Sequence, residues 1–130
     1  MLSIEYQYSQ GTGKFVKPTL FGTNALHSIN TDVNNNHAPT SGFEEAILQN
    51  GIENIRFPGG HAENTLDVTY MPRGRLRDEV KNFLDWCVEL NASGHEIVVT
   101  LVLPTKANVA LWQIEKFVYT VIRNYGEIID

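Results

Sequence analysis

The polar residues best placed to do chemistry surround a single bend in the chain, Pro58–Gly60. Arg56 comes two residues before the proline, and His61, Glu63 and Asn64 follow the glycines. Proline has no N–H for a strand ladder, and glycine lets the backbone turn sharply or lie close against a ligand. Polar groups at the carboxyl end of a strand are typical of binding sites in α/β proteins. The bend is therefore the first place to look for function.

A strand–helix pattern repeats three times around this bend. We expect strands at 19–25, 53–57 and 96–103, with a polar loop at 27–40. The third strand is almost continuously apolar, as in a parallel sheet that is buried on both faces. Residues 127–130 resemble the start of a fourth strand.

Three helices are expected after these strands. Ser41 and Glu44 have the spacing of a capping box, and Gly51 supplies a left-handed stop. The second helix carries an apolar face at helical spacing, from Leu76 to Leu90, and Asn108 can cap the third. We expect packing roles for Trp86 and Trp112 and a buried, inert thiol at Cys87.

Ahead of these units, Ile4, Tyr6 and Tyr8 alternate with polar residues, which predicts a separate β-hairpin over residues 1–16. Residues 17–130 would form the α/β part. Three parallel units fit either an open doubly wound sheet or part of a (β/α)8 barrel, and a complete barrel needs about 250 residues.

Composition limits the classes of partner. The chain has 130 residues, a formal net charge of −5 and 42% hydrophobic residues, which indicates a globular domain and argues against nucleic acid as a partner. No apolar run is long enough to span a membrane, and no signal peptide is recognisable at the N-terminus. The single cysteine excludes an internal disulfide and leaves the cellular location open.

No cofactor or metal is predicted. Residues 32–36 suggest a calcium loop, but His37 and Phe43 stand where that loop needs glycine and glutamate. His27 and His37 lack the neighbouring ligands of a zinc site. Residues 11–14 lack the spacing of a phosphate-binding loop and fit a hairpin turn. Glu63 fits a solvated loop carboxylate better than an acid/base.

The order of the motifs resembles a known family. Arg56-Phe57-Pro58-Gly59-Gly60, followed by Asn64 and Asp67, is similar to the N-terminal part of a clan A glycoside hydrolase, close to the α-L-arabinofuranosidase, xylosidase and glucuronidase groups. Phe21-Gly22-Thr23-Asn24 resembles the turn that ends an early strand in these enzymes. The likeness covers about residues 17–130.

This resemblance implies a partial (β/α)8 TIM barrel, cut before the strand that carries the acid/base glutamate. Arg56 would orient the nucleophilic carboxylate, which lies on a strand that the chain does not contain. The implied carbohydrate-binding residues are Asn24, Arg56, Gly59, Gly60, His61 and Asn64. Retaining hydrolysis needs two carboxyl groups about 5–5.5 Å apart. The resemblance places both groups on strands outside these 130 residues, so we expect the chain alone to be inactive.

A second interpretation stays open, in which the chain is a small non-catalytic, flavodoxin-like domain that binds a ligand or partner. The barrel interpretation makes a physical prediction of its own. One set of alternating residues on the third strand, either Ile97, Val99, Leu101 and Leu103 or Val98, Thr100 and Val102, would face the missing half. The fragment would then self-associate or be held by the remainder of the barrel.

Overall fold

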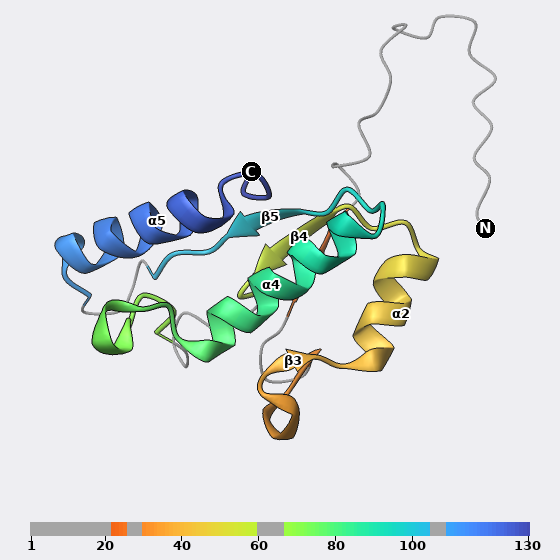
Figure 1. Ribbon diagram of the computed structural model, residues 1–130, viewed down its shortest axis with the longest axis horizontal. Helices are drawn as coiled ribbons and strands as arrows, with labels where there is room; N and C mark the ends of the chain where they lie inside the picture. The colour runs from red at the N-terminus through yellow and green to blue at the C-terminus, as the bar shows by residue number, and fades with distance from the viewer. Residues whose placement is uncertain (1–21, 26–29, 60–66, 105–108) are drawn as a thin grey trace, which may run out of the picture.

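The computed structural model describes residues 22–25, 30–59, 67–104 and 109–130, and shows a mixed α/β fold (Figure 1). Within these residues, three α-helices accompany a small parallel sheet and a two-stranded ribbon. The parallel strands are β1 (Gly22–Asn24), β4 (Asn54–Phe57) and β5 (Val98–Leu101). The helices are α2 (Ser41–Gln49), α4 (Asp78–Ala92) and α5 (Leu111–Tyr125). The hairpin predicted over residues 1–16 lies outside the described residues.

The sheet follows the order of the sequence. Its strand order is β1-β4-β5, and both pairings are parallel. At the outer edge of β5, Val99 also forms a parallel bridge with Ile129. Of residues 127–130, predicted as the start of a fourth strand, only Ile129 forms this single bridge, and residues 127 and 128 lie in a turn.

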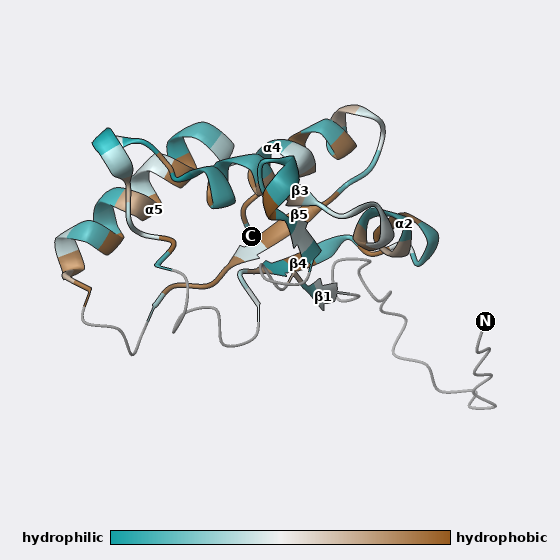
Figure 2. Cartoon of the chain, turned by 90° about the horizontal axis from the view of Figure 1, so that it is seen from below, coloured by the Kyte–Doolittle hydropathy of each residue, from teal (hydrophilic) through white to brown (hydrophobic). Residues whose placement is uncertain are grey.

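All three helices contribute to one apolar core on one face of the sheet. Ile55 and Phe57 of β4 are fully buried, and Phe57 stacks on Phe83 of α4 with ring centroids 4.1 Å apart. Ile47 of α2 and Phe117 of α5 belong to the same cluster. Figure 2 shows α4 above the strands, with α2 and α5 to either side. Alternation along the strands produces this arrangement, since every second side chain faces the helices.

The beginning of α2 differs from the prediction by one residue. The N-cap is Thr40, not Ser41, and the Thr40 hydroxyl accepts a hydrogen bond from the Phe43 N–H at 3.3 Å. Thr40 keeps an extended backbone, whereas Ser41 is already helical, and only an extended residue can cap. At the other end Gly51 has a φ of 60°, which confirms the predicted left-handed stop.

Helix α5 begins later than expected. It starts at Leu111 with Ala110 as N-cap, and the predicted cap Asn108 lies outside the described residues. The packing role of Trp86 is confirmed, because this side chain is buried between Phe43 and Phe83. The packing role of Trp112 is wrong: its side chain is 66% exposed.

The predicted loop 27–40 contains short elements of secondary structure that its polar composition does not predict. Strands β2 (Thr31–Asp32) and β3 (Ala38–Pro39) pair antiparallel around a 3-10 turn, η2 (Val33–Asn35). The Asp32 carboxylate accepts from the Asn34 N–H at 2.8 Å and so starts this turn. A second 3-10 turn, η3 (Pro72–Gly74), precedes α4.

Candidate functional site

The face of the sheet opposite the core carries a row of polar side chains. The strand register places Asn24 of β1 beside Arg56 of β4, and Arg56 beside Thr100 of β5. Neighbours in a parallel register point to the same side of a sheet. Asn24 and Arg56 are exposed and Thr100 is half-buried, whereas the alternate residues Ile55 and Val99 are fully buried. We call Asn24, Arg56 and Thr100 the polar row.

A second register position supports this row. Gly22, Asn54 and Val98 lie side by side, each two residues before the member of the polar row on the same strand. The Thr100 hydroxyl donates to the Asn54 side-chain oxygen at 3.0 Å, which connects the two positions. At Gly22 a Cβ would lie 2.9 Å from the Asn54 carbonyl oxygen, so the close approach of β1 to β4 requires glycine there.

The bend after β4 is tied to the end of β1. The Ala25 N–H donates to the Arg56 carbonyl at 2.9 Å, and the Gly59 N–H donates to the Ala25 carbonyl at 2.8 Å. A Cβ on Gly59 would lie 2.6 Å from the Cβ of Asn24. Glycine at position 59 therefore lets the bend pass directly against Asn24, which holds two predicted site residues together.

Arg56 is the charged member of the polar row. Among the residues that the structure describes, its guanidinium makes no hydrogen bond and no ion pair. A guanidinium has five N–H donors in a rigid fork that suits carboxylates, phosphates and paired hydroxyl oxygens. The group is exposed on the face of the sheet opposite the core, which we call the open face because no described helix covers it.

Three of the six predicted site residues thus come together, namely Asn24, Arg56 and Gly59. The other three, Gly60, His61 and Asn64, lie outside the described residues. Thr100 and Asn54 were not predicted as site residues. The signal for Thr100 was its alternation with Val99, and the structure selects the set Val98, Thr100 and Val102 as the one that faces away from the core.

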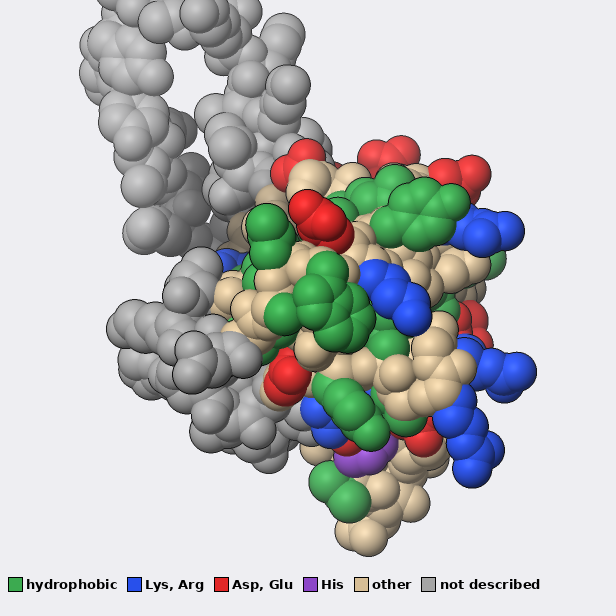
Figure 3. All heavy atoms as spheres, turned by 90° about the vertical axis from the view of Figure 1, so that its left-hand side faces the viewer, with side chains coloured by type: hydrophobic (Ala, Val, Ile, Leu, Met, Phe, Trp, Pro, Cys, Tyr) green, Lys and Arg blue, Asp and Glu red, His purple; other side chains and the backbone are tan. Residues whose placement is uncertain are grey.

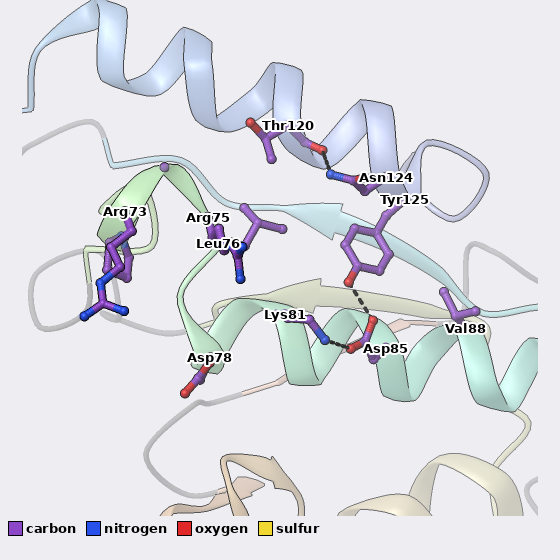
Figure 4. A pocket seen from close by; sticks show the side chains of 12 residues that line it. Arg73, Arg75, Leu76, Asp78, Lys81, Asp85, Val88, Thr120, Asn124 and Tyr125 are labelled. Atoms are coloured by element: carbon purple, nitrogen blue, oxygen red, sulfur yellow. Dashed lines mark hydrogen bonds and ion pairs between the residues drawn. The ribbon is translucent and has the colours of Figure 1, made fainter.

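A hollow of about 1240 Å³ lies between α4, α5 and residues 72–76, which precede α4 (Figure 4). Among its lining residues, Asp85 accepts hydrogen bonds from the Tyr125 hydroxyl at 2.5 Å and from the Lys81 ammonium at 2.6 Å. Burial acts to raise the pKa of Asp85, but these two donors outweigh it and lower the pKa. Burial, and then the bond to Asp85, raise the pKa of Tyr125. The carboxylate already has its partners, so the network fits a role in joining the two helices.

A further polar cluster fixes the chain between β4 and α4. The Arg77 guanidinium donates to both carboxylate oxygens of Glu79 at 2.9 Å and to the Asp67 carbonyl. Hydrogen bonding by Arg77 lowers the pKa of Glu79 to about 2. The Asp67 carboxylate accepts from the N–H and the hydroxyl of Thr69, which forms a local turn there. Gln113 of α5 donates to the Thr69 hydroxyl at 3.0 Å.

These polar clusters do not form a metal centre. In the described part of the chain, no three His, Cys, Asp or Glu residues lie close enough together to hold a metal ion. No described helix has the length and apolarity needed to cross a membrane. Cys87 is fully buried, as predicted, and burial raises the pKa of its thiol. Comparisons with protein-family models, curated proteins and solved structures found no match for this chain.

Proposed function

We propose that residues 17–130 are the first part of the (β/α)8 barrel of a retaining glycoside hydrolase acting on polysaccharide, and that the polar row contacts the sugar. The observation that carries the proposal is the position of Asn24 and Arg56, side by side and exposed on the face that the described helices leave uncovered. In a barrel this face is the interior, and its carboxyl end is the site of chemistry.

The sheet topology supports a barrel over the flavodoxin-like alternative. A doubly wound sheet reverses its strand order at a switch point and carries helices on both faces. Here the order β1-β4-β5 continues to Ile129 without reversal, and α2, α4 and α5 share one core on one face. Sequential parallel strands with helices on one side are the arrangement of a barrel wall.

Each site residue has a distinct proposed role. The Arg56 guanidinium orients a carboxylate supplied by polypeptide outside these 130 residues, and the Asn24 amide binds sugar hydroxyls. Gly59 holds the bend against the end of β1, and Gly60, His61 and Asn64 are the further residues proposed to bind the sugar. No pair of catalytic carboxyls is assigned within the chain, so binding without hydrolysis is the expected behaviour.

Saccharide titration followed by NMR tests the proposal. Arabino- and xylo-oligosaccharides added to the ¹⁵N-labelled chain should shift the amide signals of Asn24, Arg56 and Thr100. In the 130-residue chain, where that carboxylate is absent, the Arg56 guanidinium is expected to donate to sugar hydroxyls. Arg56→Ala should therefore weaken binding about 10- to 100-fold, since a hydrogen bond from a charged group contributes about 1.5–3 kcal/mol. Arg123→Ala, which removes another exposed guanidinium, from α5, is the matched control.

Two outcomes would contradict a defined sugar site, and a third would contradict the assignment of the catalytic carboxyls. One is the absence of any saccharide-induced shift on the open face, with or without shifts elsewhere. The other is equal weakening by the Arg56 and Arg123 variants, which would indicate attraction by net charge and no defined site. Release of sugar from an aryl glycoside by the pure chain would contradict the assignment of the catalytic carboxyls to other polypeptide.

A further inference from the structure

The outward face of α5 carries two exposed aromatic side chains in line. Phe117 and Val121 bury the opposite face of this helix in the core. Trp112 and Tyr119 are each 66% exposed and stand seven residues apart. Seven residues make nearly two full turns, so these side chains lie along one line, about 10 Å apart along the helix axis. We call Trp112 and Tyr119 the aromatic stripe.

Two charged side chains lie between the rings of the stripe. Glu115 and Lys116 are exposed, and each stands three or four residues from both rings, the spacing at which helical side chains are neighbours. In the described part of the chain, neither side chain makes a hydrogen bond or an ion pair. Arg123 is also exposed, but it lies beyond Tyr119 and outside this interval. The stripe therefore offers two rings with a free carboxylate and a free ammonium between them.

This surface is poorly suited to a protein partner. Lys and Glu are depleted from the centres of protein interfaces. A stable interface buries about 800 Å² on each partner, whereas one aromatic side chain buries about 150–250 Å². Leu111 and Ile122 are exposed on one flank of the stripe, with Glu115 between them along the helix. Figure 3, which views the end of the molecule where α5 begins, shows hydrophobic side chains standing apart among charged ones.

We propose that the aromatic stripe binds a segment of extended, β-1,4-linked polysaccharide. A sugar ring in such a chain has flat faces of C–H groups and an edge of hydroxyls. The faces stack on Trp112 and Tyr119, and the hydroxyls donate to the Glu115 carboxylate and accept from the Lys116 ammonium. The spacing of the rings along α5 corresponds to one disaccharide unit of the extended chain. The first and third sugars of a bound segment would thus each stack on one aromatic ring.

The stripe is separate from the polar row. Helix α5 packs its core side against one face of the sheet, and the polar row lies on the other face. The stripe, on the far side of α5, is therefore a second contact for the same polysaccharide, outside the cleft that the proposed function assigns. Its ligand class rests on that proposed function, but its geometry does not depend on Asn24 or Arg56.

Titration of the ¹⁵N-labelled chain with xylo-oligosaccharides of two and four units tests this inference by NMR. The Trp112 indole N–H and the Lys116 amide report on the stripe, whereas the amides of Asn24 and Arg56 report on the polar row. The buried Trp86 supplies an indole signal that should not move. We expect the tetrasaccharide to bind the stripe about 10-fold more tightly than the disaccharide, because only the longer chain reaches both rings.

Variants of the stripe sharpen the test. Trp112→Ala and Tyr119→Ala should each weaken tetrasaccharide binding about 10-fold, measured at the Lys116 amide, and abolish its advantage over the disaccharide. Trp112→Phe keeps a ring and should retain most of the binding. Leu111→Ala is the matched control, because it removes a 70% exposed apolar side chain without a ring from the same helix. Circular dichroism checks that each variant remains folded.

Four results would overturn the inference. The first is a Trp112 indole signal that no saccharide moves, and the second is equal affinity of the stripe for two and four sugar units. The third is equal weakening by Leu111→Ala and Trp112→Ala. The fourth is broadening of the stripe signals as protein concentration rises without sugar, which would indicate a contact between protein chains. Shifts at the polar row alone would retain the proposed function and reject the stripe, and shifts at the stripe alone would do the reverse.

Discussion

Replacement of Gly59 by alanine tests whether the bend after β4 and the end of β1 form one unit. The new Cβ would lie 2.6 Å from the Cβ of Asn24 and 3.2 Å from its Cγ. Ordinary contact begins at 3.4 Å, and neither Cβ can move without its backbone, so the two segments must separate. Overpacking of this kind costs about 1–3 kcal/mol. Loss of the 2.8 Å hydrogen bond from Gly59 to Ala25 adds about 1 kcal/mol.

We therefore expect Gly59→Ala to lower the free energy of unfolding by about 2–4 kcal/mol, measured by urea denaturation with circular dichroism. Gly42→Ala is the matched control, because a Cβ there meets nothing within 4 Å. Alanine favours a helix over glycine by about 1 kcal/mol, so this variant should gain stability. Equal urea midpoints for Gly59→Ala and the unmodified chain would refute the close approach at Asn24. Saccharide binding should also weaken in Gly59→Ala, since Asn24 moves relative to Arg56.

Two further variants probe the core and the ion pair. Phe83→Ala removes the ring that stacks on Phe57 at 4.1 Å and should cost about 3–5 kcal/mol in urea unfolding; a cost below 1 kcal/mol would mean that this stack does not anchor α4 to β4. Glu79→Gln should cost about 1–2 kcal/mol at neutral pH, after allowance for screening by solvent. Arg77 holds the pKa of Glu79 near 2, below its ordinary 4.5, so this stability is present above pH 4.5 and is lost as pH falls toward 2. The stabilities of Glu79→Gln and the unmodified chain should thus converge in acid, and a difference independent of pH would contradict the ion pair.

Much of the fold could be predicted because local patterns and tertiary structure agree here. Apolar alternation in β4 and helical spacing in α4 both place their buried residues in the core that the structure shows. Gly51 stops α2 as its sequence position indicates. These features depend on neighbours along the chain, which sequence patterns report well.

The features that could not be predicted depend on which of two similar neighbouring residues takes a role, or on contacts between residues far apart in the sequence. Thr40 and Ser41 can both cap α2, and only the backbone conformation decides between them. Trp112 is apolar and lies on α5, but it stands five and nine residues before the core residues Phe117 and Val121, a spacing that turns its side chain away from the core. The bond from Thr100 to Asn54 joins residues 46 positions apart, and it exists only in the observed register of β4 and β5.

The polar row argues on physical grounds that no second layer of helices covers this face of the sheet. If helices covered both faces of the sheet, the Arg56 guanidinium would be buried, and an unpaired buried charge costs several kcal/mol. Asn24 and Asn54, which share that face, would also need buried partners. The opposite face, in contrast, presents Ile55, Phe57 and Val99 to the core and no charge. Such asymmetry suits a sheet whose second face meets water or a polar ligand, and in a barrel the ligand that meets the carboxyl ends of the strands is the substrate.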